Sequence, residues 1–203
     1  MKYYIIAGEA SGDMHASNMM REILKEDASV QFRFWGGDKM SEIQNDGLVR
    51  HIRDLAFMGF WEVIMNLRTI SKNITFCKKD IEKYAPDALV LVDYPGFNLR
   101  IAKWAKSKGI KVYYYISPQV WAWKQSRVKQ IKSVVDRMYV ILPFEKEFYK
   151  KFDYDVDYVG HPLLDEIATY SFENKSDFHK RNGLDNRPII AILPGSRKQA
   201  ISQ

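Results

Sequence analysis

Short apolar runs alternate along the chain with amphipathic stretches. Apolar runs that end at Gly, Pro or Asp are expected to be strands. They occupy residues 3–7, 32–35, 88–92, 111–116, 137–142, 155–159 and 189–193. Several are apolar throughout, which is typical of strands covered on both faces by helices. The pattern therefore predicts an open, doubly wound, mostly parallel α/β sheet, in which sites lie at the carboxyl ends of the strands.

Two stretches have the three-to-four-residue apolar spacing of helices, residues 14–25 and a longer one within residues 55–84. The longer stripe consists of Phe60, Ile64, Leu67, Ile70, Ile74, Cys77, Ile81 and Tyr84. Four further apolar residues, Phe57, Met58, Trp61 and Met65, fall off that stripe. This surplus predicts a patch at residues 57–65 for lipid, a membrane or a partner, with a thick core helix as the alternative.

A polar stretch at residues 170–188 indicates a domain boundary, and a new buried strand is expected directly after it. We expect one domain at residues 1–168, a linker at 169–186 and the start of a second α/β unit at 187–203. A strand and a loop cannot form a domain alone, so most of the second unit is expected to be missing from this chain.

Composition excludes several classes of protein. Of 203 residues, 46% are hydrophobic and 28% charged, so the chain is not disordered, and its single cysteine excludes a disulfide framework. The four histidines are scattered, which argues against a metal site. No apolar run approaches the roughly 20 residues of a membrane-spanning helix, and no signal sequence is recognised, so we expect a cytoplasmic protein.

The net charge of +6 favours an anionic partner, either anionic lipid, a phosphorylated substrate or nucleic acid. Residues 124–151 hold 8 basic and 3 acidic residues, enough to support contact with an anionic bilayer. An ordinary solvated face is the alternative. Nucleic acid is disfavoured because the basic residues are spread out and no recognition motif is found.

The first polar loop is Gly-Glu-Ala-Ser-Gly-Asp at residues 8–13, between a strand and a helix. Its glycines permit a tight turn, and the helix start offers free N–H groups to an anion or a sugar hydroxyl. Glu9 and Ser11 add hydrogen-bonding groups there. The alternative is a capped helix, with Ser11 or Asp13 as the N-cap.

The second loop, residues 93–98, begins with Asp93 directly after the strand at 88–92. A carboxylate at the end of a buried strand is well placed to act as a base, and partial burial would raise its pKa. The alternative is an N-cap for a helix that begins at Phe97.

Two tryptophans, Trp121 and Trp123, lie in the third loop, residues 117–124. They would stack on a sugar ring, pack an acyl chain, or simply anchor the loop to the sheet. A further glycine loop, residues 193–197, ends at Arg197, whose planar fork of donors suits a diphosphate. A turn with a solvated arginine is the alternative.

Taken together, seven short motifs stand in the order found in bacterial lipid-A-disaccharide synthases, a family that this chain resembles over essentially its whole length. They occupy residues 7–13, 55–59, 93–98, 117–123, 142–145, 160–162 and 193–197. The resemblance implies the N-terminal half of a GT-B glycosyltransferase, built from two Rossmann-like domains with a cleft between them. Family members are nearly twice this length, so the chain alone is expected to be inactive.

The family transfers 2,3-diacylglucosamine from UDP-2,3-diacylglucosamine to the 6-hydroxyl of 2,3-diacylglucosamine 1-phosphate. The product is the β-1,6-linked lipid A disaccharide, and UDP is released. The resemblance implies an inverting, metal-independent enzyme without a cofactor, which works at the cytoplasmic surface of the inner membrane. The first domain is expected to hold mostly the acceptor and the second mostly the nucleotide sugar.

An inverting transfer needs a base for the acceptor hydroxyl and positive charge for the departing diphosphate. We expect Asp93 to be the base. Substrate-binding residues are expected to be Glu9, Ser11, Gly12, Asn98, Trp121, Trp123 and Arg197. Acyl chains or the bilayer are expected to contact Met58, Phe60, Trp61, Ile64 and Met65.

Two other functions are consistent with parts of the sequence. A nucleotide-sugar transferase with a soluble acceptor would not need the surplus of apolar residues at 57–65. A non-catalytic α/β module that binds membranes would explain that surplus and the basic residues, but not the polar groups at three strand ends.

Overall fold

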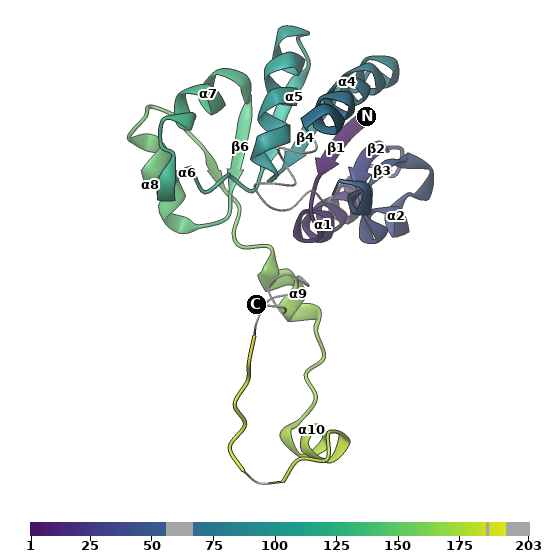
Figure 1. Cartoon of the computed structure of the whole chain (residues 1–203), viewed down its shortest axis with the longest axis vertical. Helices are drawn as coiled ribbons and strands as arrows, with labels where there is room; N and C mark the ends of the chain where they lie inside the picture. Colours follow the sequence, from purple (N-terminus) through teal and green to yellow (C-terminus); the bar gives the residue numbers. More distant parts are fainter. Residues whose placement is uncertain (56–66, 186, 194–203) are drawn as a thin grey trace. The chain divides into compact units, whose positions relative to one another are not determined.

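The computed structural model describes residues 1–55, 67–185 and 187–193, and the chain divides into two compact units (Figure 1). Unit 1 is Met1–Pro162 and contains a large sheet. Unit 2 is Leu163–Gln203, and its described residues include helices α9 (Leu163–Thr169) and α10 (Lys175–Arg181).

Unit 1 is built on a seven-stranded sheet in the order β3-β2-β1-β4-β5-β6-β7, and every neighbouring pair is parallel. The strands are β1 (Lys2–Ala7), β2 (Gln31–Gly36), β3 (Leu48–His51), β4 (Ala88–Val92), β5 (Lys111–Tyr115), β6 (Arg137–Val140) and β7 (Asp157–Tyr158). The strand order reverses between β1 and β4, where open α/β sheets form their crevices. The predicted doubly wound parallel sheet is confirmed.

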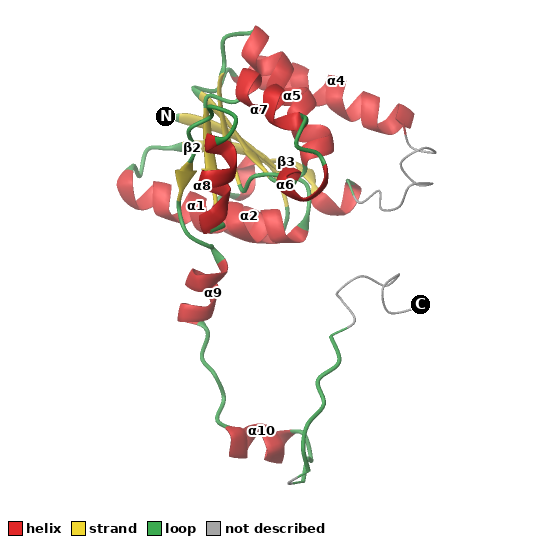
Figure 2. Cartoon of the chain, turned by 90° about the vertical axis from the view of Figure 1, so that its left-hand side faces the viewer, coloured by secondary structure: helices red, strands yellow, loops and turns green. Residues whose placement is uncertain are grey.

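Helices cover both faces of this sheet (Figure 2). Helices α4 (Leu67–Tyr84), α5 (Pro95–Ser107) and α7 (Arg127–Val134) pack on one face, and α1 (Ala10–Glu26) and α2 (Asp38–Ile43) pack on the other. Two shorter helices, α6 (Val120–Trp123) and α8 (Pro143–Lys150), follow β5 and β6. Strand β4 is buried at all five positions, which accounts for its uniformly apolar sequence.

The helix predicted within residues 55–84 is confirmed over Leu67–Tyr84, and Cys77 and Ile81 of its apolar stripe are fully buried. The same helix contributes Asp80, whose carboxylate accepts hydrogen bonds from the Tyr4 hydroxyl at 2.7 Å and from Arg33 Nε at 2.8 Å. A buried carboxylate is tolerated when such partners compensate for its lost hydration. Helix α4 is thus fixed to β1 and β2 by a polar contact as well as by packing.

Some boundaries differ from the expected ones. Strand β3 was not predicted, because its short sequence, Leu-Val-Arg-His, has no apolar run and its residues are only half-buried at the sheet edge. Helix α1 begins at Ala10, four residues before the predicted start, and its N-cap is Glu9. Ser11 and Asp13 therefore lie inside the first turn, and neither caps this helix.

The strand predicted at residues 189–193 is wrong, since the structure shows irregular chain there. Ile190 is 87% exposed and Leu193 is 92% exposed, and no described strand pairs with this segment. A strand is stable only when a neighbour satisfies its backbone groups and covers its side chains, so an apolar run alone does not produce one.

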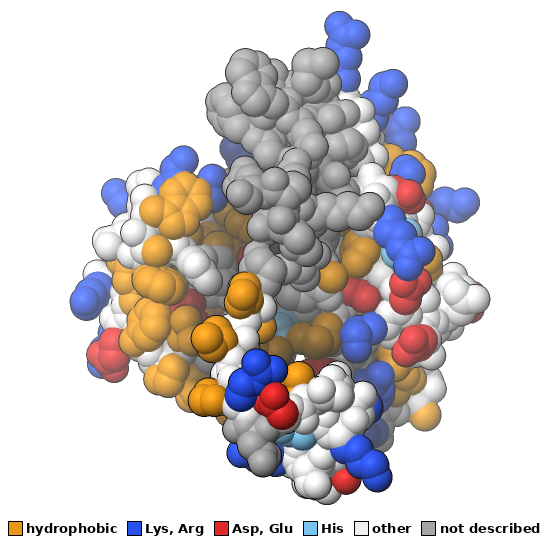
Figure 3. All heavy atoms as spheres, turned by 60° about the horizontal axis from the view of Figure 1, so that its bottom comes forward, with side chains coloured by type: hydrophobic (Ala, Val, Ile, Leu, Met, Phe, Trp, Pro, Cys, Tyr) orange, Lys and Arg blue, Asp and Glu red, His pale blue; other side chains and the backbone are white. Residues whose placement is uncertain are grey.

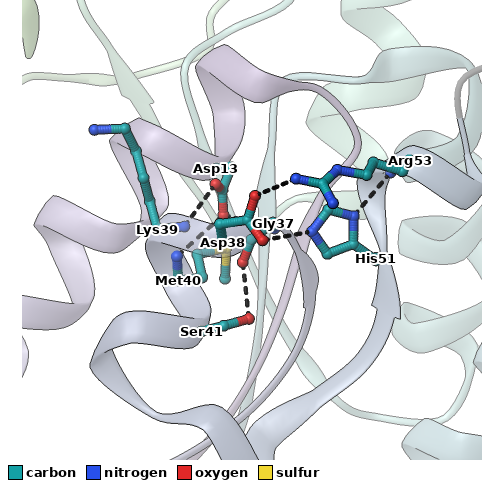
Figure 4. Close-up of polar contacts among 8 residues, drawn as sticks. All are labelled: Asp13, Gly37, Asp38, Lys39, Met40, Ser41, His51 and Arg53. Carbon is teal, nitrogen blue, oxygen red and sulfur yellow. Dashed lines mark hydrogen bonds and ion pairs between the residues drawn. The ribbon is translucent and has the colours of Figure 1, made fainter.

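Asp13 fastens α1 to the start of α2 (Figure 4). Its carboxylate, 4% exposed, accepts hydrogen bonds from the backbone N–H of Gly37 at 2.6 Å, Lys39 at 3.1 Å and Met40 at 3.1 Å. These are N-terminal donors of α2, which have no partner within that helix. A Cβ at Gly37 would lie 2.6 Å from Asp13 Oδ2, so only glycine fits there.

On the exposed side of the same turn, Asp38 accepts from Arg53 at 2.7 Å and lies 3.2 Å from His51 Nε2 (Figure 4). This contact links the end of β3 to α2. Within the described ranges 1–55, 67–185 and 187–193, no helix combines the length and apolar character needed to cross a membrane.

We predict that Asp13→Ala lowers the free energy of unfolding by about 2–3 kcal/mol, because buried N–H groups lose their acceptor. Urea denaturation followed by circular dichroism measures the loss. Asp38→Ala is the matched control, since its exposed ion pairs contribute about 1 kcal/mol or less. Equal losses in the two variants would contradict the anchoring role of Asp13.

Candidate functional site

A pocket of about 330 Å³ opens at the carboxyl ends of three neighbouring strands in unit 1. It is lined from the loop after β4 by Asp93 and Pro95, from the segment after β5 by Ile116, Ser117, Pro118, Gln119, Val120, Trp123 and Arg127, and from the segment after β6 by Ile141, Leu142 and Glu145. Its volume lies at the lower end of the roughly 300–1,000 Å³ of small-molecule sites. Loops that are distant in sequence therefore meet where the sheet topology predicts a site.

Asp93 lies in a sharp turn between β4 and α5. Asp93 and Tyr94 both have left-handed backbones, with φ of 44° and 47°, a conformation that costs non-glycine residues about 1–2 kcal/mol. The turn is held because the Asp93 carbonyl accepts hydrogen bonds from Asn98 Nδ2 at 2.8 Å and from the Tyr114 hydroxyl at 2.5 Å. The backbone of Asp93 is thereby fixed at the edge of the pocket.

The electrostatic setting of Asp93 favours proton uptake. Burial raises the pKa of the Asp93 carboxyl above its usual range, and the nearby Glu9 carboxylate raises it further. A carboxyl group of raised pKa, facing a pocket, can accept a proton from a bound hydroxyl. This arrangement agrees with the base predicted at the end of β4.

The loops after β1 and β4 fit directly against each other. A Cβ at Gly8 would lie 2.4 Å from the Tyr94 ring, so the absence of a side chain at Gly8 makes room for that ring. A Cβ at Gly12 would lie 3.3 Å from the Cβ of Ala7, which explains the close approach of α1 to β1. Packing thus accounts for both glycines of the first loop.

A second acidic side chain, Glu145, also lines the pocket, and sequence reasoning did not select it. It is 1% exposed, and its carboxylate accepts from the N–H of Leu142 at 2.9 Å and of Ile141 at 3.2 Å. Burial raises the pKa of Glu145, although these donors and Ser117 oppose the rise. Ser117 Oγ in turn lies 2.6 Å from the Tyr149 hydroxyl, so the polar lining residues Ser117 and Glu145 are both held by hydrogen bonds.

The two tryptophans differ in their surroundings. Trp121 is half-buried, packs edge-on against Phe144 of α8 with ring centroids 5.0 Å apart, and does not line the pocket. Trp123 is 68% exposed and does line it. Figure 3 shows hydrophobic side chains gathered over the part of unit 1 that holds α6 and α8.

Arg127 brings positive charge into the pocket, and sequence reasoning missed it as well. Its guanidinium carbon lies 5.2 Å from the centre of the Trp123 ring. Trp123 ends α6 and Arg127 begins α7, so the turn between the two helices brings the side chains together. A contact made across a turn in this way had no signal in the sequence.

The other predicted site residues do not line the pocket. Glu9 is exposed at the N-cap of α1, and Ser11 is exposed in the first turn of the same helix. Asn98 is fully buried, and its Nδ2 lies within 3.4 Å of the carbonyls of Ile6, Val92 and Asp93. Asn98 therefore holds the backbone of the site in place. Substrate contact by Glu9, Ser11 and Asn98 stays a prediction.

Several predicted residues lie outside the described residues, namely Arg197 and the apolar set Met58, Phe60, Trp61, Ile64 and Met65. Their roles also stay predictions. Over the described part of the chain, no three His, Cys, Asp or Glu side chains are grouped so as to hold a metal ion.

Several solved structures share the fold of this chain, and two of them are named as UDP-N-acetylglucosamine 2-epimerases. A putative UDP-N-acetylglucosamine 2-epimerase from Listeria monocytogenes matches 92% of this chain and 51% of its own chain, at a TM-score of 0.63 and 13% identity. The UDP-GlcNAc 2-epimerase of Methanocaldococcus jannaschii, solved with UDP-GlcNAc and UDP, matches 90% and 54%, at a TM-score of 0.60 and 15% identity. At this identity the likeness shows the fold alone.

Sequence relatives are much more similar. The lipid-A-disaccharide synthase of Trichlorobacter lovleyi is 43% identical over 202 residues, which cover 98% of this chain and 51% of the relative. That of Syntrophotalea carbinolica is 44% identical over 199 residues, which cover 97% and 50%. The chain thus spans about half the length of the curated relatives it matches. A family model described as lipid-A-disaccharide synthetase matches residues 3–203, and the chain therefore belongs to the lipid-A-disaccharide synthetase family.

Proposed function

We propose that this chain supplies the acceptor-side half of a lipid-A-disaccharide synthase. The reaction joins 2,3-diacylglucosamine from UDP-2,3-diacylglucosamine to the 6-hydroxyl of 2,3-diacylglucosamine 1-phosphate, with release of UDP. The observation that carries the proposal is the partly buried carboxyl of Asp93 at a sugar-sized pocket, in a chain of this family. The UDP-GlcNAc and UDP bound to the Methanocaldococcus jannaschii neighbour support a UDP-sugar donor.

In the proposed step, Asp93 removes the proton from the acceptor 6-hydroxyl as the oxygen attacks the anomeric carbon of the donor. The new oxygen–carbon bond forms on the face opposite the leaving group, so the configuration inverts. The bond from the anomeric carbon to the diphosphate breaks, and its electron pair leaves with UDP. A base of raised pKa suits this role because it holds the proton more firmly.

The departing diphosphate carries negative charge. We assign the stabilisation of that charge to Arg197. Glu9 acts on the base, since its negative charge raises the pKa of Asp93. In this proposal the reaction uses neither a metal nor a cofactor, because base and cation are both protein side chains. The acyl chains and the membrane surface are assigned to the apolar residues at 57–65, so the enzyme would work at the cytoplasmic face of the inner membrane.

We predict that Asp93→Asn, in a full-length version that includes the second half, lowers kcat by about 10²–10⁴-fold, because the base is lost. Asparagine tolerates the left-handed backbone of residue 93, so the fold should stay intact. Disaccharide formation from the two lipid substrates measures kcat, and thermal unfolding checks the fold.

Asp87→Asn is the matched control, since Asp87 is an exposed aspartate that accepts a hydrogen bond from the N–H of Lys2, at the opposite end of β1 from the pocket. Its turnover should stay near that of the unchanged enzyme. Near-normal turnover in Asp93→Asn would overturn the assignment of the base.

The raised pKa of Asp93 sets the pH dependence. The base works only when ionised, so kcat/KM should fall as the pH drops through a pKa above the usual aspartate range. Glu9→Gln removes a negative neighbour, lowers this pKa and should move the acid limb of the profile to lower pH. Glu22→Gln, at an exposed position further along α1, should leave the limb in place. An upward shift in Glu9→Gln would contradict the electrostatic argument.

A further inference from the structure

Two cations lie over one exposed aromatic ring, that of Trp123. Trp123 and Arg127 line the pocket, whereas Lys124 contacts the ring without lining the pocket. Arg127 lies with its guanidinium carbon 5.2 Å from the centre of the Trp123 ring, and Lys124 Nζ lies 6.0 Å from the same centre. Within the described part of the chain, neither side chain forms an ion pair with a carboxylate. Cation–π contact orients these cations without neutralising them. Their charge is therefore available to an anion.

The pocket has an acidic side chain and a basic side chain that come from different segments of the chain. Asp93 comes from the loop after β4, and Arg127 begins the helix α7 that follows the β5 loop. Both charges act on the buried Tyr114 hydroxyl: burial raises its pKa most, Asp93 raises it further and Arg127 lowers it. The base and the cation thus both line one pocket of about 330 Å³.

The remaining charged lining group, Glu145, competes little for Arg127. Its carboxylate already accepts hydrogen bonds from two backbone N–H groups and is stabilised by Ser117. Burial also raises its pKa, which reduces its tendency to be ionised. An incoming phosphate therefore finds the guanidinium unengaged.

We propose that Arg127 and Lys124, held against Trp123, bind the phosphate group of the acceptor sugar. The inference rests on the proposed function, in which the acceptor carries a 1-phosphate, and it names the subsite that orients this acceptor. In a hexosamine 1-phosphate the phosphate is on C1 and the CH₂OH group with the 6-hydroxyl is on C5, the two carbons bonded to the ring oxygen. A phosphate held on the planar fork of Arg127 leaves the 6-hydroxyl of the same sugar for Asp93, which lines the same pocket.

The test uses the 203-residue chain and three soluble probes: glucosamine 1-phosphate, glucosamine and UDP. Binding is followed by NMR through the indole N–H signal of Trp123, with calorimetry for the dissociation constant. We expect saturable binding of glucosamine 1-phosphate that shifts the Trp123 signal, and weaker binding of glucosamine. Absence of saturable binding of glucosamine 1-phosphate would overturn the subsite.

Arg127→Gln should weaken the binding of glucosamine 1-phosphate about 10- to 100-fold, the range expected for a lost charge-assisted contact. The dissociation constant of glucosamine should stay unchanged. Lys129→Gln removes the same charge two residues along α7, outside the pocket, and should change neither constant more than about twofold. Lys124→Gln gives a milder loss and replaces Arg127→Gln if that variant unfolds.

Three outcomes for Arg127→Gln would overturn the subsite. They are an unchanged dissociation constant for glucosamine 1-phosphate, an equal loss of affinity for glucosamine, and a loss of affinity confined to UDP. The second would mean a structural role for Arg127, and the third would mean that the cations receive the donor diphosphate. The proposed function is tested separately by turnover in Asp93→Asn. A normal Arg127→Gln constant with an inactive Asp93→Asn enzyme would remove the subsite and keep the function.

Discussion

The buried amide of Asn98 is the contact on which the site depends. Its Nδ2 is within hydrogen-bonding distance of carbonyls at the ends of β1 and β4, where the strand order reverses, and of the Asp93 carbonyl. Removing the amide would take a buried hydrogen-bond donor away from these carbonyls, at a cost of about 1–3 kcal/mol. The same amide stabilises the left-handed turn that carries Asp93 to the pocket. The geometry of the base is thus set by a residue of α5 that does not line the pocket.

Environment separates the roles of the two acidic side chains in the pocket. The pKa values of Asp93 and Glu145 are both raised, mainly by burial, but their partners differ. Glu145 is held by backbone donors and by Ser117, as expected of a carboxylate that caps α8. Asp93 instead has a carboxylate neighbour, Glu9, which leaves it better suited to accept a proton. Glu145 therefore stabilises the structure of the pocket, whereas Asp93 is the group suited to react.

Apolar runs that end at Gly, Pro or Asp were enough to predict six of the seven strands of the sheet, all except β3. Strand β4 was predicted to the residue, and the rule for parallel sheets correctly brought Asp93 and Trp123 to one edge. Contacts between distant segments were not predictable in this way. The acceptor role of Asp13 depends on Gly37, and the strand expected at residues 189–193 failed because strand formation needs a partner that an apolar run does not reveal.

The contact between Gly8 and the Tyr94 ring couples two loops that are 86 positions apart in the sequence. Any side chain at position 8, even a single methyl group, would push on the ring and so on the turn that carries Asp93. The size of the residue at position 8 therefore affects where the Asp93 carboxyl group lies. Sequence change there is limited by the geometry of another loop, and not by anything that residue 8 itself would bind.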